Sequence, residues 1–262
     1  MNLSYQTVII GFEDFLKRYE KMNFGQIILI LLVGLGASFV QRVCGFGLGI
    51  FAMLFLPHFI PDHTAAVTIS CFFSCITTTY NSIKFRKNIP YKTVFPLLVA
   101  SFVSIPIAVY GSVYISGDVF KIILGIVLII LSFYLLFFNS KVKIKPSVKN
   151  GLIAGTAGGV LGGLFSTGGP PAVLYMTYAA ADKLAYFAGL QFYFCLTNYY
   201  ATLFRITSGI VTLQVLIYTV IGLVGCMIGD ILGKQVFDKL DAVKSKQIIY
   251  IAMIISGILM LL

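Results

Sequence analysis

Residues 155–178 read GTAGGVLGGLFSTGGPPAVLYMTY, and residues 34–57 read GLGASFVQRVCGFGLGIFAMLFLP. Each stretch is an apolar helix with spaced glycines, followed by a Gly-rich break and a second, shorter apolar helix. Irregular backbone inside a membrane leaves N–H and C=O groups without water, so it is tolerated only where it is buried in protein or lines a cavity. Two such breaks at corresponding places in the two halves of a chain are typical of a transporter's binding site.

The composition indicates a membrane protein. Of the 262 residues, 59% are hydrophobic and 11% are charged, whereas about a quarter of the residues of a soluble domain are charged. We therefore expect a multi-pass α-helical protein of the cell inner (plasma) membrane, in contact with the lipid bilayer. The net charge of +10 does not indicate nucleic-acid binding, because Lys and Arg lie in short loops between apolar runs, as the positive-inside rule predicts.

The apolar runs divide the chain into parts that repeat. We expect an N-terminal interfacial leader at 1–23, a first transmembrane repeat at 24–139, a basic cytoplasmic linker at 140–150 and a second transmembrane repeat at 151–262. A shift of about 120 residues lays Gly34 on Gly155 and Gly47 on Gly168, which indicates an internal duplication. The expected fold is therefore all-α, with two repeats, each containing a broken or re-entrant helix pair and three spanning helices.

The orientation of the two repeats stays open at this point. If the broken pair is a re-entrant hairpin, each half crosses the membrane an odd number of times and the repeats are inverted; if it amounts to one span, they are parallel. The distribution of Lys and Arg slightly favours the inverted arrangement, and both arrangements place the basic loop 84–92 in the cytoplasm. Residues 205–209, RITSG, are expected to form a loop between the runs 184–204 and 210–232.

The breaks are the candidate substrate site. A helix N-terminus carries about half a positive charge and is an anion site, so two helices that begin inside the membrane would suit a small anion. The candidate residues of the two breaks are Gly45, Phe46, Gly47, Ser166, Thr167, Gly168, Gly169 and Pro170. The alternative is that the glycines only permit close helix packing, and Gly155, Gly159 and Gly163, at a spacing of four, fit that alternative well.

Polar side chains inside the apolar runs are further candidates. Arg42 is a strong base beside the first break, and Gln41 adds a neutral donor; a charge at membrane depth is costly and usually functional. The alternative for Arg42 is that it extends to the membrane surface or pairs with a backbone carbonyl.

Three amides and one carboxylate complete the candidates. Asn81, Asn198 and Gln191 lie inside apolar runs, where substrate contact and hydrogen bonding between helices are both reasonable roles. Asp230 is a carboxylate well inside a run, and it is a candidate for proton coupling, although it lies near a helix end where solvent could reach it.

No catalytic or cofactor motif accompanies these residues. The sequence has no His-Glu-x-x-His, no Gly-x-Ser-x-Gly and no nucleotide-binding loop. The five cysteines lie inside apolar runs without a Cys-x-x-Cys pair, so we expect packing residues and no metal site. We therefore expect a protein that is not an enzyme, needs no cofactor and does not hydrolyse ATP.

The chain resembles the sulfite exporter TauE/SafE family of membrane transporters. The resemblance lies in Gln41-x3-Gly45-Phe46-Gly47-Leu48-Gly49 with Pro57 behind it, and in the run from Gly158 to Pro171, GGVLGGLFSTGGPP, followed by Leu174-Tyr175. The two motifs keep their order and separation, and the resemblance covers the chain from about Phe24 to Leu262.

This resemblance implies secondary transport of a small anionic substrate such as sulfite or an organosulfonate. The substrate, the direction of transport, the coupling ion and the oligomeric state stay open, and a homodimer is one of the open alternatives. Other functions compatible with the sequence are an anion channel, a membrane-embedded enzyme or accessory subunit of sulfur metabolism, and a structural membrane protein whose breaks serve packing alone.

Overall fold

The computed structural model describes residues 24–133, 145–237, 254–255, 257–258 and 261. The described part is helical, as predicted. Besides helical residues between 254 and 261, its elements are α2 (Phe24–Cys44), α3 (Leu48–Phe59), α4 (His63–Lys84), the 3-10 helix η1 (Arg86–Asn88), α5 (Tyr91–Val113), α6 (Gly117–Phe133), α7 (Val148–Phe165), α8 (Gly169–Ala179), α9 (Lys183–Thr207) and α10 (Leu213–Phe237). The expected leader, part of the linker and most of the last apolar run lie outside the described residues.

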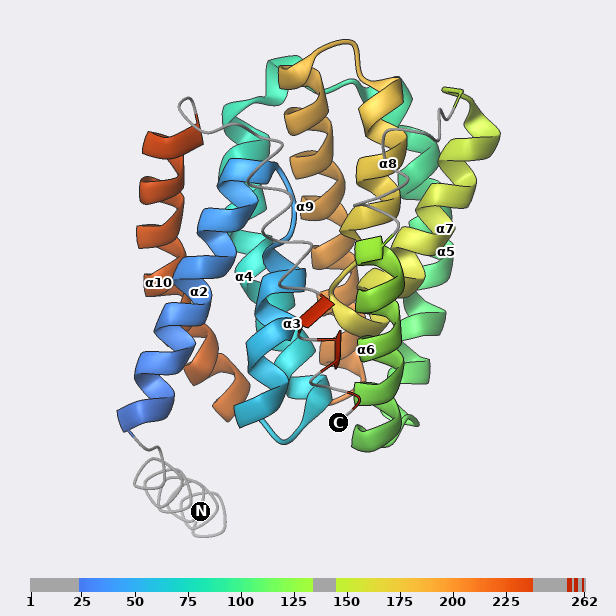
Figure 1. Ribbon diagram of the computed structural model, residues 1–262. Coiled ribbons are helices and arrows are strands. Elements are labelled where there is room, and N and C mark those ends of the chain that lie inside the picture. The colour runs from blue at the N-terminus through green and yellow to red at the C-terminus, as the bar shows by residue number, and fades with distance from the viewer. Residues whose placement is uncertain (1–23, 134–144, 238–253, 256, 259–260, 262) are drawn as a thin grey trace, which may run out of the picture.

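The helices alternate in direction along one common axis (Figure 1). α2 runs upward, α3 returns downward, and α4, α5 and α6 follow in alternation. α7 then runs downward, α8 upward, α9 downward and α10 upward. Each expected break therefore separates two antiparallel helices, and the second of each pair is short, with 12 residues in α3 and 11 in α8.

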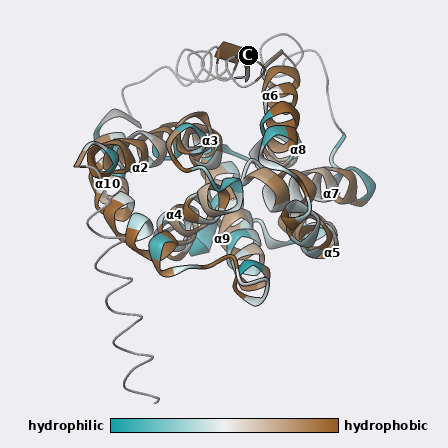
Figure 2. Ribbon diagram, turned by 90° about the horizontal axis from the view of Figure 1, so that it is seen from below, coloured by the Kyte–Doolittle hydropathy of each residue, from teal (hydrophilic) through white to brown (hydrophobic). Residues whose placement is uncertain are grey.

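Two central helices hold two peripheral pairs apart. α4 and α9 lie side by side in the middle, with α2 and α10 on one flank and α5 and α7 on the other (Figure 2). Each flank thus pairs a helix from one half of the chain with a helix from the other half. The short helices α3 and α8 lie between these flanks and the central pair.

The flanking helices carry an apolar surface that suits lipid. On α5 the exposed large side chains include Phe95, Val99, Val103 and Ile107, and on α10 the same spacing recurs, so each helix presents one continuous apolar stripe. By length and composition three described helices could cross a membrane, at 24–44, 91–113 and 213–235.

The central helices are more polar than the flanking ones because they face protein. Hydrogen bonds join α4 and α9 along their length: Asn198 Nδ2 donates to Ser74 Oγ at 3.1 Å, and Thr79 Oγ1 donates to Tyr199 at 3.2 Å. Polar side chains inside a membrane protein are stabilised by such partners on neighbouring helices. The polar residues that interrupt the apolar runs of α4 and α9 therefore have partners inside the protein.

Glycine stripes bring the flanking helices into backbone contact. Gly225 and Gly229 of α10 lie against the carbonyl groups of Leu31 and Leu35 of α2. On the other flank the stripe Gly151, Gly155, Gly159 and Gly163 of α7 lies against α5. The packing interpretation of the last three is thus confirmed for this face of α7, as expected for small residues spaced by four.

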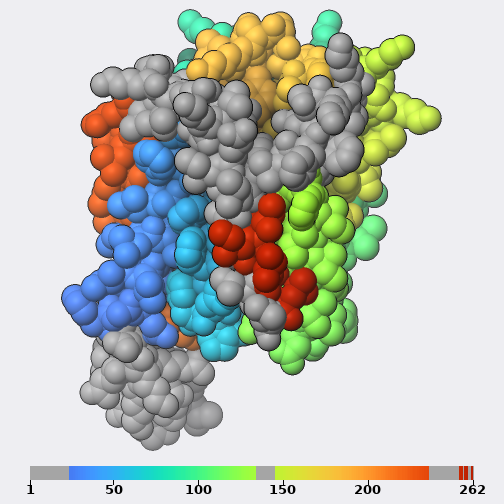
Figure 3. All heavy atoms as spheres, in the orientation of Figure 1, coloured from blue at the N-terminus to red at the C-terminus, as the bar shows by residue number. Residues whose placement is uncertain are grey.

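The remaining helices close one side of the protein. Phe120 of α6 is fully buried, with its ring 5.0 Å from the ring of Phe165 and 4.5 Å from that of His63. The described residues after 253 lie between α3 and α6 on the face shown in Figure 3. α6 therefore covers the lower part of the region where the two halves of the chain meet.

Replacing Gly229 by leucine is expected to destabilise the protein strongly. A side chain there would overlap the carbonyl group of Leu35, and overpacking a buried interface costs about 1–3 kcal/mol or more. Gly111→Leu is the matched control, since no atom of the described residues lies within 4 Å of a Cβ at this helical position. Thermal unfolding in detergent should show a lower midpoint for Gly229→Leu only; equal midpoints would contradict the packing described.

Candidate functional site

The first break owes its geometry to two glycines. α2 ends at Cys44, and Gly45 and Gly47 have φ angles of 82° and 104°. Positive φ angles are unfavourable for residues with a Cβ atom, but glycine adopts them readily. The chain thereby reverses direction within three residues, and α3 begins at Leu48 inside the protein. Gln191 of α9 donates its Nε2 hydrogen to the carbonyl oxygen of Gly45 at 2.9 Å, which holds the break against the other half of the chain.

The second break uses a strained serine in place of a glycine. Ser166 follows α7 with a φ of 56°, an uncommon conformation for a residue with a side chain and one found often at functional sites. Its N–H donates to Gly162 at 3.0 Å, and its Oγ accepts a hydrogen bond from Ser70 at 3.0 Å. Gly168 then caps α8, whose first turn contains Pro170 and Pro171.

The two breaks cross in direct contact. A Cβ on Gly49 would overlap the carbonyl oxygen of Ser166, and a Cβ on Gly169 would touch the ring of Phe46 at 3.4 Å. The N-terminal ends of α3 and α8 therefore meet in the centre of the protein. The two positive helix ends reinforce one another there.

The two helix ends differ in the donors that they offer. The first N–H groups of any helix have no acceptor within that helix, so α3 presents those of Leu48, Gly49 and Ile50. In the first turn of α8, Pro170 and Pro171 have no N–H, which leaves the N–H of Gly169. The first break therefore offers more free backbone N–H groups than the second break.

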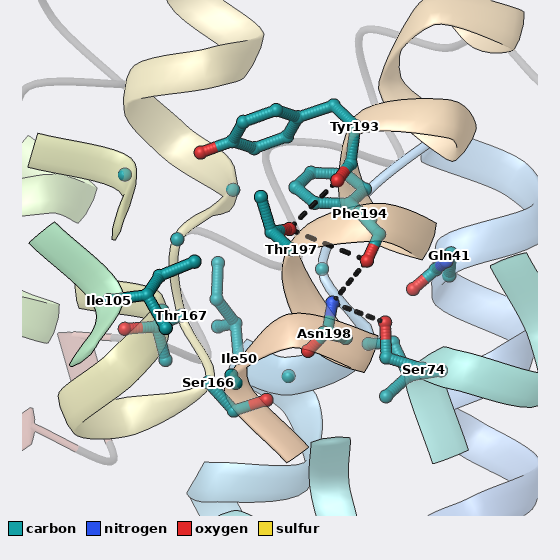
Figure 4. A pocket seen from close by; sticks show the side chains of 18 residues that line it. Gln41, Ile50, Ser74, Ile105, Ser166, Thr167, Tyr193, Phe194, Thr197 and Asn198 are labelled. Atoms are coloured by element: carbon teal, nitrogen blue, oxygen red, sulfur yellow. Dashed lines mark hydrogen bonds between the residues drawn. The ribbon is translucent and has the colours of Figure 1, made fainter. Parts of the chain in front are cut away.

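A small cavity lies at this crossing (Figure 4). It offers about 40 Å³ to the centre of a water-sized sphere, and one water molecule needs about 10–15 Å³ by this measure. The cavity therefore suits a few water molecules or one small ion. Its lining residues come from both halves of the chain: Gln41, Gly47, Leu48, Gly49, Ile50, Ser74, Ile105, Gly158, Gly162, Ser166, Thr167, Gly168, Gly169, Tyr193, Phe194, Thr197, Asn198 and Ala201.

The cavity wall combines polar and apolar groups and contains no charged side chain. Thr197 and Asn198 of α9 and Ser74 of α4 lie on one side, and Ser166 and Thr167 on another (Figure 4). The hydroxyl of Thr167 is buried and has no hydrogen-bond partner in the described part of the chain, and a buried hydroxyl without a partner is destabilising. A bound polar species would restore that hydrogen bond.

The predicted site residues divide into two groups. The cavity is lined by Gln41, Gly47, Ser166, Thr167, Gly168, Gly169 and Asn198. Outside its wall lie Arg42, Gly45, Phe46, Asn81, Pro170, Gln191 and Asp230. Gly45 and Gln191 are nevertheless adjacent, because Gln191 bonds to Gly45 and accepts a hydrogen bond from Gln41 at 3.2 Å.

Arg42 is buried and already has partners. Its Nη1 donates to Asn81 Oδ1 and lies 3.8 Å from an Asp230 carboxylate oxygen. The rings of Phe85 and Phe187 have their centroids 5.9 and 5.8 Å from its guanidinium carbon, close enough for a cation–π contribution. Arg42, Asn81 and Asp230 therefore form one cluster that joins α2, α4 and α10, and neither the surface nor a backbone carbonyl is the partner of Arg42.

The prediction that Arg205 lies in a loop is wrong. The expected loop 205–209 begins too early, because α9 continues to Thr207 and the Arg205 side chain is fully buried. No Gly, Pro or Asp lies between Gly189 and Gly209, and a basic residue is favourable in the last turn of a helix. These two signals could have extended the helix by one turn.

Ser74 and Tyr193 were also missed as wall residues. Ser74 lies seven residues before Asn81 on the same face of α4, and Tyr193 lies four residues before Thr197 on α9. Such spacing places side chains on a common helix face. The signal was present but did not distinguish these residues from ordinary buried ones.

Gln191→Leu is expected to loosen the first break. The change removes the hydrogen bonds to Gly45 and Gln41 and leaves a buried carbonyl without its donor, at a cost of about 1–3 kcal/mol. The matched control is Gln214→Leu, because Gln214 bonds to Tyr218 at the start of α10, away from the breaks. Chemical or thermal denaturation should report the loss; an unchanged stability of Gln191→Leu would show that this bond does not hold the break.

Comparison with known proteins gives one match. A family model described as "Sulfite exporter TauE/SafE" matches residues 30–260 of the chain. Searches of curated proteins and of solved structures found no match.

Proposed function

The chain belongs to the sulfite exporter TauE/SafE family of membrane transporters, and from this premise we propose that it is a secondary carrier of small anions. The family description names sulfite, and we propose sulfite or an organosulfonate, which also carries its negative charge on oxygens bonded to sulfur, as the substrate class. The chain is a multi-pass membrane protein, and its family consists of transporters, not enzymes.

The single observation that carries the proposal is the crossing of the two breaks. Two helix N-termini, from different halves of the chain, point their positive ends at one small cavity. A preformed pair of helix ends stabilises a negative charge without a mobile side chain. The cavity volume and the hydroxyl and amide groups in its wall suit a small oxyanion better than a large solute.

Inverted repeats are part of this proposal. With a shift of about 120 residues, α2 corresponds to α7, α3 to α8, α4 to α9 and α5 to α10, and in Figure 1 each helix runs opposite to its counterpart. The caps agree too: Asp62 and Asp182 each accept from the N–H groups two and three residues later. Transporters built this way place their substrate between the repeats, where a rocking motion exposes it to either side.

The charge distribution orients the carrier. The upper end in Figure 1 holds η1 and the first turns of α5, α7 and α9. Described basic residues at this end are Lys84, Arg86, Lys87, Lys92, Lys145, Lys149, Lys183 and Lys234. By the positive-inside rule this end faces the cytoplasm.

The predicted residues take two roles in the proposed site. Gln41, Asn198, Ser166, Thr167 and the break glycines contact the anion in the cavity. Gln191, Phe46 and Pro170 shape the breaks.

The Arg42 cluster beside the first break is the proposed coupling element. Protonation of Asp230 would remove the charge that Arg42 now faces at 3.8 Å, so the guanidinium could approach an entering anion from the cytoplasmic end. Asn81 would then remain as the partner that keeps Arg42 in place. This arrangement couples anion entry to proton binding.

The proposal is tested by binding. A ligand that binds the folded protein raises its apparent stability by RT ln(1 + [L]/Kd), so purified protein is heated with sulfite, sulfate, thiosulfate, sulfoacetate, taurine, lactate and acetate in turn. At least one small anion should stabilise the wild type in a saturable manner, and Asn198→Leu should weaken that response. Thr207→Val, outside the cavity, is the control. No response to any anion would refute the proposed substrate class.

A further inference from the structure

Arg205 is a buried cation that belongs neither to the cavity wall nor to the Arg42 cluster. It lies in the last turn of α9, and its exposed fraction is 0%. Its Nη2 donates to the carbonyl oxygen of Gly163, in the last turn of α7. The last turn of α9 lies at the lower end of that helix in Figure 1, whereas the last turn of α2, which contains Arg42, lies at the upper end of α2.

The described residues do not balance the charge of Arg205. Among them, Nε and Nη1 of Arg205 have no hydrogen-bond partner although both atoms are buried, and no carboxylate lies within 4 Å of the guanidinium. Burying a charge without an ion partner costs several kcal/mol. One carbonyl at a helix end offsets that cost only in part, so a further negative group is expected at this place.

Arg42 provides the contrast within the same chain. It is equally buried, but it has a carboxylate partner in Asp230, an amide partner in Asn81 and two aromatic rings. At the position about 120 residues after Arg42 stands Gly163, whose carbonyl group receives Arg205. The two arginines thus occupy related places at opposite ends of the breaks, and only Arg42 has an acidic partner among the described residues.

Arg205 lies next to the cavity. Ala201, one helical turn before it, lines the cavity, as does Gly162, the neighbour of its acceptor. Ile105, which packs with Ala201 in one buried cluster, lines the cavity too. An anion leaving the crossing toward the lower end would reach the guanidinium within about one helical turn, some 5 Å.

We infer that Arg205 is an anion-binding residue of the transport pathway and that the transported oxyanion is its missing partner. A guanidinium has five N–H donors on two paired edges; a single bond from Nη2 leaves one edge complete. A complete edge matches two oxygens of a carboxylate, sulfonate, sulfite or sulfate. This inference rests on the proposed function. It places one arginine on each side of the cavity, with Arg42 toward the cytoplasm and Arg205 toward the other side of the membrane.

The test compares Arg205→Met with wild type and with Arg86→Met, which removes an exposed arginine of η1. Binding of labelled sulfite to purified full-length protein is measured by equilibrium dialysis, and the thermal midpoint is measured without anion. Removing an unbalanced buried charge should raise the anion-free midpoint, and sulfite affinity should fall at least about tenfold. Arg86→Met should leave both unchanged.

Each outcome decides the inference. Wild-type affinity in Arg205→Met would overturn it and leave the carrier proposal intact, whereas no sulfite binding by the wild type would remove both. If Arg205→Met does not yield folded protein, Arg205→Lys keeps the charge but loses the paired edge. An affinity at least about tenfold weaker supports the inference, and an unchanged affinity overturns it.

Discussion

Gly49→Ala is expected to weaken transport strongly although it adds only one methyl group. The new Cβ would overlap the carbonyl oxygen of Ser166, and a backbone atom cannot turn aside as a side chain can. Separating the breaks costs about 1–3 kcal/mol or more, and since every 1.4 kcal/mol is about a factor of ten, binding at the crossing should fall at least about tenfold. Uptake of labelled anion into proteoliposomes measures the loss.

Gly111→Ala is the control for that substitution. It adds the same methyl group to a glycine of α5 outside the cavity, where no atom of the described residues lies within 4 Å of a new Cβ. Transport by Gly111→Ala should stay within a small factor of wild type. Normal transport by Gly49→Ala would mean that the breaks need not touch, and the proposed site would lose its basis.

Asp230→Asn is expected to destabilise the protein and to uncouple transport from protons. The change leaves the buried Arg42 guanidinium without an ion partner. Removing one member of a buried pair costs about 3–5 kcal/mol, but the Asp230 side chain is 21% exposed, so solvent screening should reduce this to about 2 kcal/mol. Uptake should then no longer respond to an imposed proton gradient.

A double-mutant cycle separates the pair from its members. Arg42→Met with Asp230→Asn removes both charges, so the double variant should be more stable than Asp230→Asn alone. Asp118→Asn, at the exposed start of α6, serves as the control and should change stability little. Additive effects in the cycle would show that Arg42 and Asp230 do not interact, and a preserved proton response in Asp230→Asn would remove that residue from coupling.

The two breaks could be predicted because their cause is local. Gly45 and Gly47 supply the left-handed backbone, and Pro170 and Pro171 start a helix, so the sequence alone indicates where the helices stop and begin. The composition likewise predicts membrane helices, and the identity of Arg42 as a buried polar residue follows from its place in an apolar run.

Partners across the fold could not be predicted in this way. Arg42 pairs with Asp230, 188 positions later, and Gln41 with Gln191, and no local pattern links such residues. The same holds for Arg205, whose partner Gly163 lies in α7. From the sequence alone, a basic residue four positions before Gly209 resembles a loop residue. The glycines of α7 serve both helix packing and the cavity, because those on one face pack against α5 and those on another face line the cavity.

Counterflow in proteoliposomes tests the central claim most directly. Vesicles containing the protein are preloaded with unlabelled anion from the binding panel, and entry of the labelled anion is followed at rising concentration. A carrier with one site reached from alternate sides predicts saturable entry that the preloaded anion accelerates. Entry that rises linearly without acceleration would indicate a channel, and no protein-dependent entry of any anion would contradict the account.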